Sequence, residues 1–273
     1  MDLSFFNKVT AFILSVIVTV CGWLNVSVRP MGQKLDLSEY ELVFCDDFDA
    51  DELDLSAWHL RGEGIRREGY NAGSQLKLEN GELKITAEYR EDGSYGTGWY
   101  SGMIALNQLY LHGYFEIKCV CNKGGGFWSA FWLQSGTSYV HDASKGGVGG
   151  AEIDIMEAPL YDEFMPTKRN SVTHAIHCNG GDDNPDKLDS YRPGKFRGND
   201  IYNTYNTYGL EWTEDEYIFY INGVETTRTS FSKGVSTVPE EVIVSLEIPD
   251  EVMFSEGEST VMTVDYVKIY QKP

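Results

Sequence analysis

Short stretches of β-branched and aromatic residues recur along the chain, and almost none of the chain follows the 3.6-residue period of a helix. Residues of this kind pack well on a pleated sheet, so six stretches predict strands: Leu83–Glu88, Tyr114–Val120, Ala130–Leu133, Val172–His177, Tyr217–Ile221 and Val242–Ile248. Asn80-Gly81 and Asn222-Gly223 indicate hairpins, because Asn and Gly tolerate the positive φ angles of a type I′ turn. The pattern predicts an all-β fold, an antiparallel β-sandwich of the jelly-roll kind.

The beginning of the chain has a different pattern. Residues 9–28 form an apolar stretch that follows Lys8 and precedes Arg29. A charged start followed by an apolar segment is typical of a secretory signal, and this length also suits a membrane anchor. We expect residues 1–30 to be a signal peptide or an N-terminal membrane anchor, with the protein secreted or held at the cell surface. Residues 38–273 are expected to form one domain that acts as a monomer.

Composition narrows the class of ligand. The 273 residues carry a formal net charge of −20 at pH 7. Such a charge repels nucleic acid, anionic lipid and strongly anionic glycans, so a neutral polysaccharide is a better fit. The 28 glycines and 17 tyrosines suit a turn-rich sandwich with an aromatic lining.

Three carboxylates occur within the six residues Glu152–Glu157 (EIDIME). Side chains alternate along a strand, so Glu152 and Asp154 share one face and Glu157 would point to the other. One extra residue bulged out near Met156 would change the parity and bring Glu157 back to the first face. The sequence therefore predicts a bulged strand with three acids on one side.

Crowded carboxylates suit a particular chemistry. Like charges repel and burial disfavours ionisation, so one acid of the group should keep its proton near neutral pH. A protonated carboxylic acid beside an ionised one is what glycoside hydrolysis requires. The alternatives are a solvated edge strand and a calcium loop, although calcium loops usually interleave their acids with Asn, Asp and Gly.

The EIDIME motif resembles the active-site strand of glycoside hydrolase family 16, in the bulged form of its laminarinase-like members. The resemblance extends over residues 41–271 and includes five further landmarks in the order of the family. These landmarks are Phe44–Trp58, Gly113–Lys118, Gly126–Leu133, Tyr208–Trp212 and Asp265–Tyr270.

The resemblance implies a glycoside hydrolase catalytic domain at residues 38–273. It further implies a retaining endo-β-glycanase that hydrolyses β-1,3- or mixed β-1,3/1,4-glucan by double displacement, in an open cleft on the concave sheet. In the family pattern, Glu152 is the nucleophile, Glu157 the general acid/base and Asp154 the partner that orients Glu152. No cofactor is expected for catalysis. Two alternatives stay open: the same chemistry on a β-galactoside-containing glycan, and a glycan-binding module without activity.

Aromatic residues are expected to line the cleft. Trp128 and Trp132 are four residues apart on a predicted strand and share a face with Ala130. Flat sugar rings stack on indoles, and a small residue between the two tryptophans leaves room for a glycan chain. In the resembled family both positions line the cleft, whereas without it a core position would be equally reasonable.

Four other residues are candidates for the site. His174 and His177 lie three apart, on opposite faces of a strand, and His174 is the better candidate for the cleft because the family often has a histidine on the strand after the catalytic one. Arg66 and Asn71 belong to a Gly-rich loop that we expect to form a cleft wall. Asp265 is a lone acid on a hydrophobic strand, and relatives suggest that such an acid could bind a structural calcium.

Two segments depart from the pattern of the family. Residues 244–249 (VSLEIP) replace a small-and-glycine ending that is common in its glucanases, and residues 178–183 (CNGGDD) form an unusual acidic loop. Both are expected near the rim of the cleft. They leave the linkage specificity open.

Overall fold

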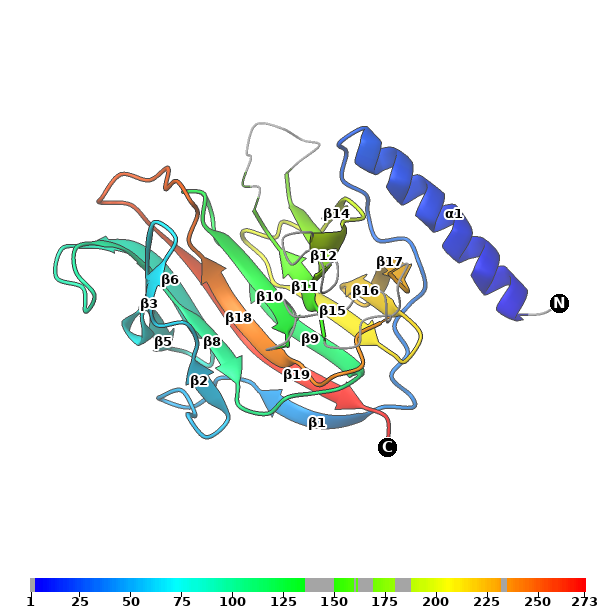
Figure 1. The fold of residues 1–273 in the computed structure, drawn as a ribbon, viewed down its shortest axis with the longest axis horizontal. Helices are drawn as coiled ribbons and strands as arrows, with labels where there is room; N and C mark the ends of the chain where they lie inside the picture. The colour runs from blue at the N-terminus through cyan, green and yellow to red at the C-terminus, as the bar shows by residue number, and fades with distance from the viewer. Residues whose placement is uncertain (1–2, 136–149, 160, 162–168, 180–187, 232–234) are drawn as a thin grey trace.

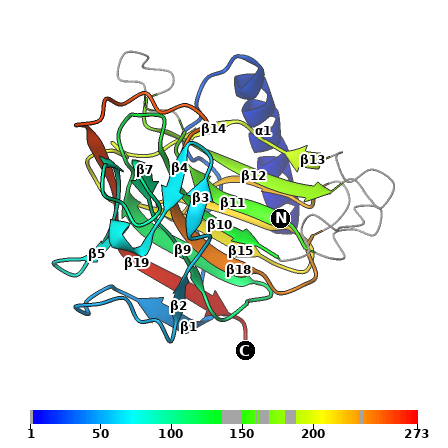
Figure 2. The ribbon, with the colours of Figure 1, turned by 60° about the vertical axis from the view of Figure 1, so that its left-hand side comes forward.

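The structure, a computed structural model, describes residues 3–135, 150–159, 161, 169–179, 188–231 and 235–273 (Figure 1). Two curved sheets are stacked face to face in these residues, which confirms the predicted jelly-roll sandwich. One helix, α1 (Leu3–Trp23), lies outside the sandwich (Figure 2), and a 3₁₀ turn, η1 (Gly73–Gln75), connects two strands.

The larger sheet has eleven strands. Its main order is β17-β16-β15-β9-β19-β6-β7-β4-β3, with β1 added beside β19 and β5 beside β6. Their bounds are β1 (Glu41–Asp46), β3 (Gly64–Arg66), β4 (Gly69–Asn71), β5 (Leu76–Leu78), β6 (Leu83–Arg90), β7 (Gly98–Ser101), β9 (Gly113–Val120), β15 (Asn206–Trp212), β16 (Tyr217–Ile221), β17 (Val224–Thr229) and β19 (Ser259–Gln271). All pairs are antiparallel except β4 with β7.

The smaller sheet has eight strands and carries the acidic motif. Its main order is β13-β12-β11-β10-β18-β8-β2, with β14 added beside β12. Their bounds are β2 (Trp58–Leu60), β8 (Met103–Leu106), β10 (Trp128–Gln134), β11 (Glu152–Glu157), β12 (Ser171–Asn179), β13 (Leu188–Tyr191), β14 (Lys195–Arg197) and β18 (Glu241–Glu247). The motif strand β11 therefore has neighbours on both sides, β10 and β12.

All six predicted strands are present, as β6, β9, β10, β12, β16 and β18. Both predicted hairpin turns are present too. Asn80 and Gly81 have φ angles of 59° and 71°, and Asn222 and Gly223 have φ angles of 52° and 69°. These left-handed conformations are the ones that a type I′ turn needs, so the pattern of strands and turns was sufficient to predict these hairpins.

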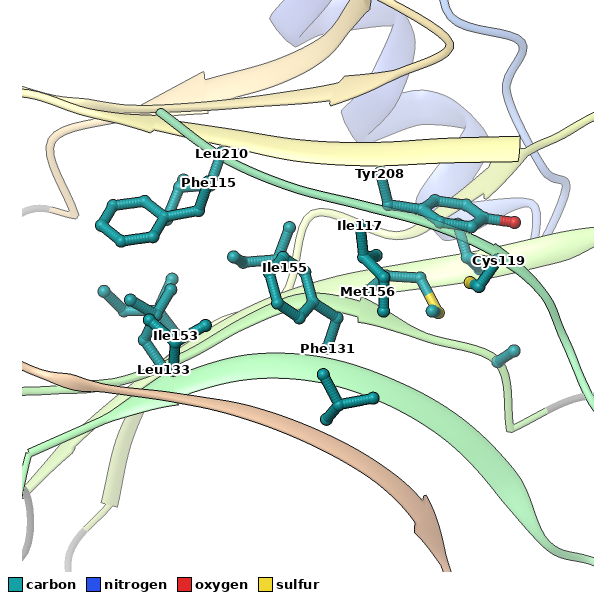
Figure 3. Close-up of a cluster of buried hydrophobic side chains, with 14 of the residues drawn as sticks. Phe115, Ile117, Cys119, Phe131, Leu133, Ile153, Ile155, Met156, Tyr208 and Leu210 are labelled. Carbon is teal, nitrogen blue, oxygen red and sulfur yellow. The ribbon is translucent and has the colours of Figure 1, made fainter. Parts of the chain in front are cut away.

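The hydrophobic core fills the space between the two sheets (Figure 3). The larger sheet contributes side chains such as Phe115 and Ile117 from β9, and the smaller sheet contributes Phe131 from β10. Apolar side chains of β11 complete this layer. Most of the inner face of the smaller sheet is apolar, whereas Glu152, Asp154 and Glu157 lie on its outer face.

The apolar N-terminal stretch forms the helix α1, which contacts β17. Leu14 and Val18 are buried against the main core, whereas Phe12 and Trp23 on its other sides are 70% and 85% exposed. Among the described residues, no helix has the length and hydropathy needed to cross a membrane. The role of residues 1–30 in export stays a prediction.

Candidate active site

The motif strand β11 contains one extra residue relative to both neighbours. Asp154 lies opposite Ala175 of β12 and Glu157 lies opposite Thr173, so three steps along β11 correspond to two along β12. The pairing with β10 shifts at the same place. This is the geometry of a β-bulge, and the predicted bulge near Met156 is present.

The bulge decides where the acids point. Ile155 and Met156 are consecutive, yet both are fully buried and point into the core (Figure 3). Glu157 therefore returns to the outer face with Glu152 and Asp154. All three acids line one cleft of about 300 Å³ on that face.

The cleft extends to both sides of the acids. On one side it is lined by Trp128, Ala130 and Trp132, which alternate along β10 and point outward as predicted. On the other side a hollow of about 410 Å³ is lined by Thr173 of β12 and Lys195 of β14. The acids therefore line both hollows and lie between them in one open groove.

Glu157 has the environment of a carboxylic acid that keeps its proton. Burial, followed by the nearby charge of Asp154, raises the pKa of Glu157 to about 8. The indole Nε1 of Trp128 donates a hydrogen bond to Glu157 Oε1 at 3.1 Å, which partly opposes this rise because it favours the ionised form. At neutral pH the protonated form dominates.

Glu152 is held by a chain of hydrogen bonds that begins outside the motif. The amide Nε2 of Gln134 donates to Glu152 Oε2 at 2.6 Å. Arg61 fixes the orientation of that amide, because its Nη2 donates to Gln134 Oε1, also at 2.6 Å. Arg61 is held in turn by Glu241, whose Oε2 lies 2.6 Å from the Arg61 Nε. The network stabilises Glu152 in one position.

Asp154 lies between the two glutamates and is almost completely buried. Burial and the charge of Glu152 raise its pKa well above the ordinary value. Its Oδ2 lies 3.2 Å from Nε2 of His177, and the other ring nitrogen of His177 lies 2.7 Å from Ser190 Oγ. Burial also lowers the pKa of His177, so the pKa shifts of both groups disfavour their ionised forms.

His174 and His177 both line the hollow of about 410 Å³, but His174 is only 1% exposed and His177 is the histidine beside the acids. His174 points into the sandwich, where its ring stacks on Phe219 at 4.7 Å and its Nδ1 lies 2.6 Å from Ile155 O. Burial lowers the pKa of His174 to about 4. His177 pairs with Glu152 in the sheet and so shares its face. Without the register of β12 the sequence offers no signal that separates the two.

Both tryptophans point into the cleft, but arginines lie on their rings. The guanidinium of Arg67 is 4.7 Å from the ring centre of Trp128, and that of Arg61 is 4.9 Å from Trp132. Trp132 also donates its Nε1 to Ser245 Oγ at 3.1 Å, which fixes its orientation. A stacked sugar would therefore use the free parts of these rings or displace an arginine.

Arg66 and Asn71 have different positions, although both come from the predicted wall loop. Arg66 lines the cleft and its Nη2 donates to Glu247 Oε2 at 2.6 Å, which ties β3 to β18. Asn71 is only 2% exposed and is not among the residues that line the cleft, so a contact with sugar is not supported there.

Glu247, a further acid in the cleft, belongs to segment 244–249, one of the two segments that depart from the family pattern. The other departing segment is described only at residues 178–179.

The surroundings of Asp265 do not fit a calcium ion. Its Oδ2 lies 2.7 Å from the ammonium of Lys118, and a lysine occupies the place where a cation would bind. Among the described residues, the one group with three donors close enough for a metal is Glu152, Asp154 and His177, within 4.8 Å of one another. These groups already have partners within the protein. Glu152 accepts a hydrogen bond from Gln134, and Asp154 and His177 contact each other.

Comparison with known proteins identifies the family of this site. A family model described as "Beta-porphyranase A-D, GH16 domain" matches residues 41–272. The chain belongs to glycoside hydrolase family 16. Membership makes it a glycoside hydrolase, as the bulged acidic strand predicted.

Curated relatives of the family 16 chain are distant. A β-glucanase of Rhodothermus marinus is 24% identical over 78% of this chain and 71% of its own length. A β-glucanase of Brevibacillus brevis is 24% identical over 87% and 82%. The endo-1,3-1,4-β-glycanase ExsH of Rhizobium meliloti is 24% identical over 71% of this chain, which spans 39% of the length of ExsH.

Solved structures show the same fold. SCLam, a non-specific endo-β-1,3(4)-glucanase of family 16, superposes with a TM-score of 0.70 at 20% identity, over 92% of this chain and 98% of its own. The LamAcat domain from Zobellia galactanivorans gives 0.63 at 18% identity, over 84% and 97%. At these identities the likeness describes the fold of the family 16 domain alone.

Proposed function

We propose that the chain is a retaining endo-β-glucanase that hydrolyses β-1,3- or mixed β-1,3/1,4-glucan by double displacement. The single observation that carries this proposal is the bulge of β11, which puts Glu152, Asp154 and Glu157 on one face of an open groove. A groove that is open at both sides suits attack within a polymer rather than at its end.

The surroundings of each acid support a division of roles. Glu152 is the nucleophile: it attacks the anomeric carbon and forms a glycosyl-enzyme intermediate. Glu157, protonated at neutral pH, donates its proton to the leaving oxygen and then takes a proton from the water that releases the product. Asp154 positions Glu152 and, when protonated, removes one negative charge from the group. No cofactor takes part in these steps.

The proposal of a glucan substrate rests on the curated relatives, which are β-glucanases and an endo-1,3-1,4-β-glycanase. A β-galactoside-containing glycan is the second candidate, because the matching family description names a β-porphyranase. A binding module without activity is the least favoured alternative, since binding alone does not require a buried acid pair with a raised pKa.

A substrate panel tests the proposal. Release of reducing ends would be measured with laminarin, lichenan and porphyran, and the expected result is rapid release from laminarin or lichenan. Release from porphyran alone would support a β-galactoside-containing substrate. No release from any glycan would support a binding module without activity. Proton NMR of the earliest products should show the β-anomer, and a first-formed α-anomer would contradict double displacement.

A further inference from the structure

A basic pocket lies beyond the catalytic groove, at the end of β14 that is farther from the acids. Arg29, Arg169 and Arg197 line this cavity, which has a volume of about 450 Å³. Asp200 is the one acid among its described lining residues, so the lining carries three positive charges against one negative charge. A local excess of positive charge is unusual in a chain whose net charge is −20.

Backbone hydrogen bonds hold the three arginine-bearing segments together. Val28 N donates to Lys195 O and Arg197 N donates to Val28 O, both at 2.8 Å. Gly198 N donates to Asn170 O at 3.0 Å. Each arginine therefore lies at, or directly beside, a residue that is fixed to a neighbouring segment. The cluster is organised by the fold rather than by chance contacts of long side chains.

Arg29 and Arg169 retain capacity for a ligand, and Arg197 is held in place beside them. Arg197 donates its Nε and Nη2 to Ser27 Oγ at 3.3 and 3.1 Å, which orients its guanidinium. In the part of the chain that the structure describes, neither Arg29 nor Arg169 forms an ion pair with a carboxylate. Both are exposed, and their five N–H donors suit a group with several acceptor oxygens.

We propose that this pocket binds an oxyanion: a sulfate, phosphate or carboxylate group held by Arg29, Arg169 and Arg197. Planar guanidinium groups bind such oxygens through paired, charge-assisted hydrogen bonds. The site is separate from the acids and does not depend on the substrate proposed above. It is complete only in a chain that keeps Arg29, as an N-terminal anchor does and a cleaved signal peptide does not.

The position of the pocket suggests two sources for the oxyanion. Arg197 is two residues from Lys195 on the same face of β14, a spacing of about 6.6 Å, and Lys195 lines the groove beside Glu157. A glycan in the groove that continued along β14 would bring a charged substituent to the arginines. The other source is a free inorganic anion.

Titration calorimetry with sodium sulfate tests the site directly, at constant ionic strength set with chloride. The wild-type chain should bind sulfate saturably, and the double variant Arg29→Gln/Arg169→Gln should bind it at least about tenfold more weakly, since a hydrogen bond to a charged group is worth roughly 1.5–3 kcal/mol. Both side chains are exposed, so the double variant should fold. Arg90→Gln, which removes an arginine of β6 paired with Glu88, is the matched control and should bind sulfate like the wild type.

Equal sulfate affinity in the wild type and the double variant would overturn the proposal, as would an equal loss in Arg90→Gln. This measurement requires no turnover, so its failure is distinct from failure of the proposed hydrolase activity.

Kinetic measurements then distinguish the two sources of the oxyanion. A glycan-borne anion predicts that the ratio of KM for a sulfated or uronate-bearing oligosaccharide to KM for a neutral one rises about tenfold in the double variant. A constant ratio together with lost sulfate binding assigns the site to a free anion.

Discussion

At the scale of residues, two glutamates of the same motif have different surroundings, and these predict different responses to mutation. Glu152→Ala removes the nucleophile and should be inactive unless an added anion attacks the anomeric carbon in its place, which would give an inverted, α-linked product. Glu157→Ala should regain turnover of an activated aryl β-glycoside when azide is added, because azide can attack the glycosyl-enzyme without a general base. NMR of the rescued product should show a β-glycosyl azide. A β-glycosyl azide from Glu152→Ala, or an α-glycosyl azide from Glu157→Ala, would instead exchange the two roles.

The hydrogen bond from Trp128 to Glu157 predicts a change in pH dependence. Protonated Glu157 is the active acid, so kcat should fall as the pH rises through about 8. The Trp128 Nε1–H favours the ionised carboxylate, so Trp128→Phe, which lacks this donor, should move the alkaline limb of the kcat profile to higher pH. A limb that stays in place or moves to lower pH would show that this bond does not set the pKa of Glu157.

Gln134 should act on the reaction through Glu152. Gln134→Ala removes a donor to a charged oxygen, and a bond of this kind is worth roughly 1.5–3 kcal/mol, so kcat should fall about 10- to 100-fold. Gln134→Glu puts a carboxylate beside the nucleophile and should lower kcat further at pH 7 than at pH 5, since the added acid is neutralised at low pH. Equal losses at both pH values would show that the effect is structural rather than electrostatic.

At the scale of elements, the sequence predicted the strands, the hairpin turns and the bulge, because each depends on local chemistry. Alternation along a strand and the parity of Glu152–Glu157 are properties of a few consecutive residues. The choice between His174 and His177 depended on the register between β11 and β12, which no local pattern sets. The arginines that lie on Trp128 and Trp132 precede them by 61 and 71 positions, so only the folded chain brings each pair together.

The bulge predicts how hydrolysis should respond when one residue is removed from β11 or added to it. Deletion of Ile155 restores strict alternation and still leaves all three acids outward, so the variant should keep detectable hydrolysis while losing about 2–5 kcal/mol of stability for the missing core side chain. Insertion of one alanine after Ile155 also keeps Glu157 outward by alternation, but puts it four strand positions from Asp154 instead of the two that the bulge leaves, about 6.6 Å farther along the strand. This displacement should reduce kcat roughly 100-fold or more, as misplaced catalytic groups do. Thermal melts and kcat would be measured together. A folded deletion variant as inactive as the insertion variant would contradict the parity argument.

At the scale of the whole molecule, the net charge gives the sum of all charges but does not give the sign of the charge at a particular site. The chain carries −20, yet Arg61, Arg66 and Arg67 all line the catalytic groove. The expectation that acidity excludes anionic glycans therefore applies to long-range attraction and does not extend to contacts within the groove. The sign of the charge at a site depends on which segments the fold places together, here the segment from β2 to β4, which includes β3, and the outer face of the smaller sheet.

A buried acid outside the groove should make the stability of the whole domain depend on pH. Glu240 is fully buried, its Oε1 accepts a hydrogen bond from Ala151 N at 2.9 Å, and burial raises its pKa to about 8. A carboxyl whose pKa is higher in the folded than in the unfolded state favours folding below the unfolded pKa near 4.5. That contribution is lost as the pH rises toward 8. The melting temperature of the wild type should accordingly fall between pH 5 and pH 8.5.

Glu240→Gln has no charge to bury, so its melting temperature should fall less over the same range. Part of the slope should remain, because Glu157 has a raised pKa of the same sign. Glu52→Gln, at an exposed position, is the matched control and should leave the wild-type slope unchanged. Melting curves of the three proteins at several pH values provide the measurement. Parallel slopes for Glu240→Gln and the wild type would mean that Glu240 is already ionised in the folded protein, stabilised by partners other than Ala151.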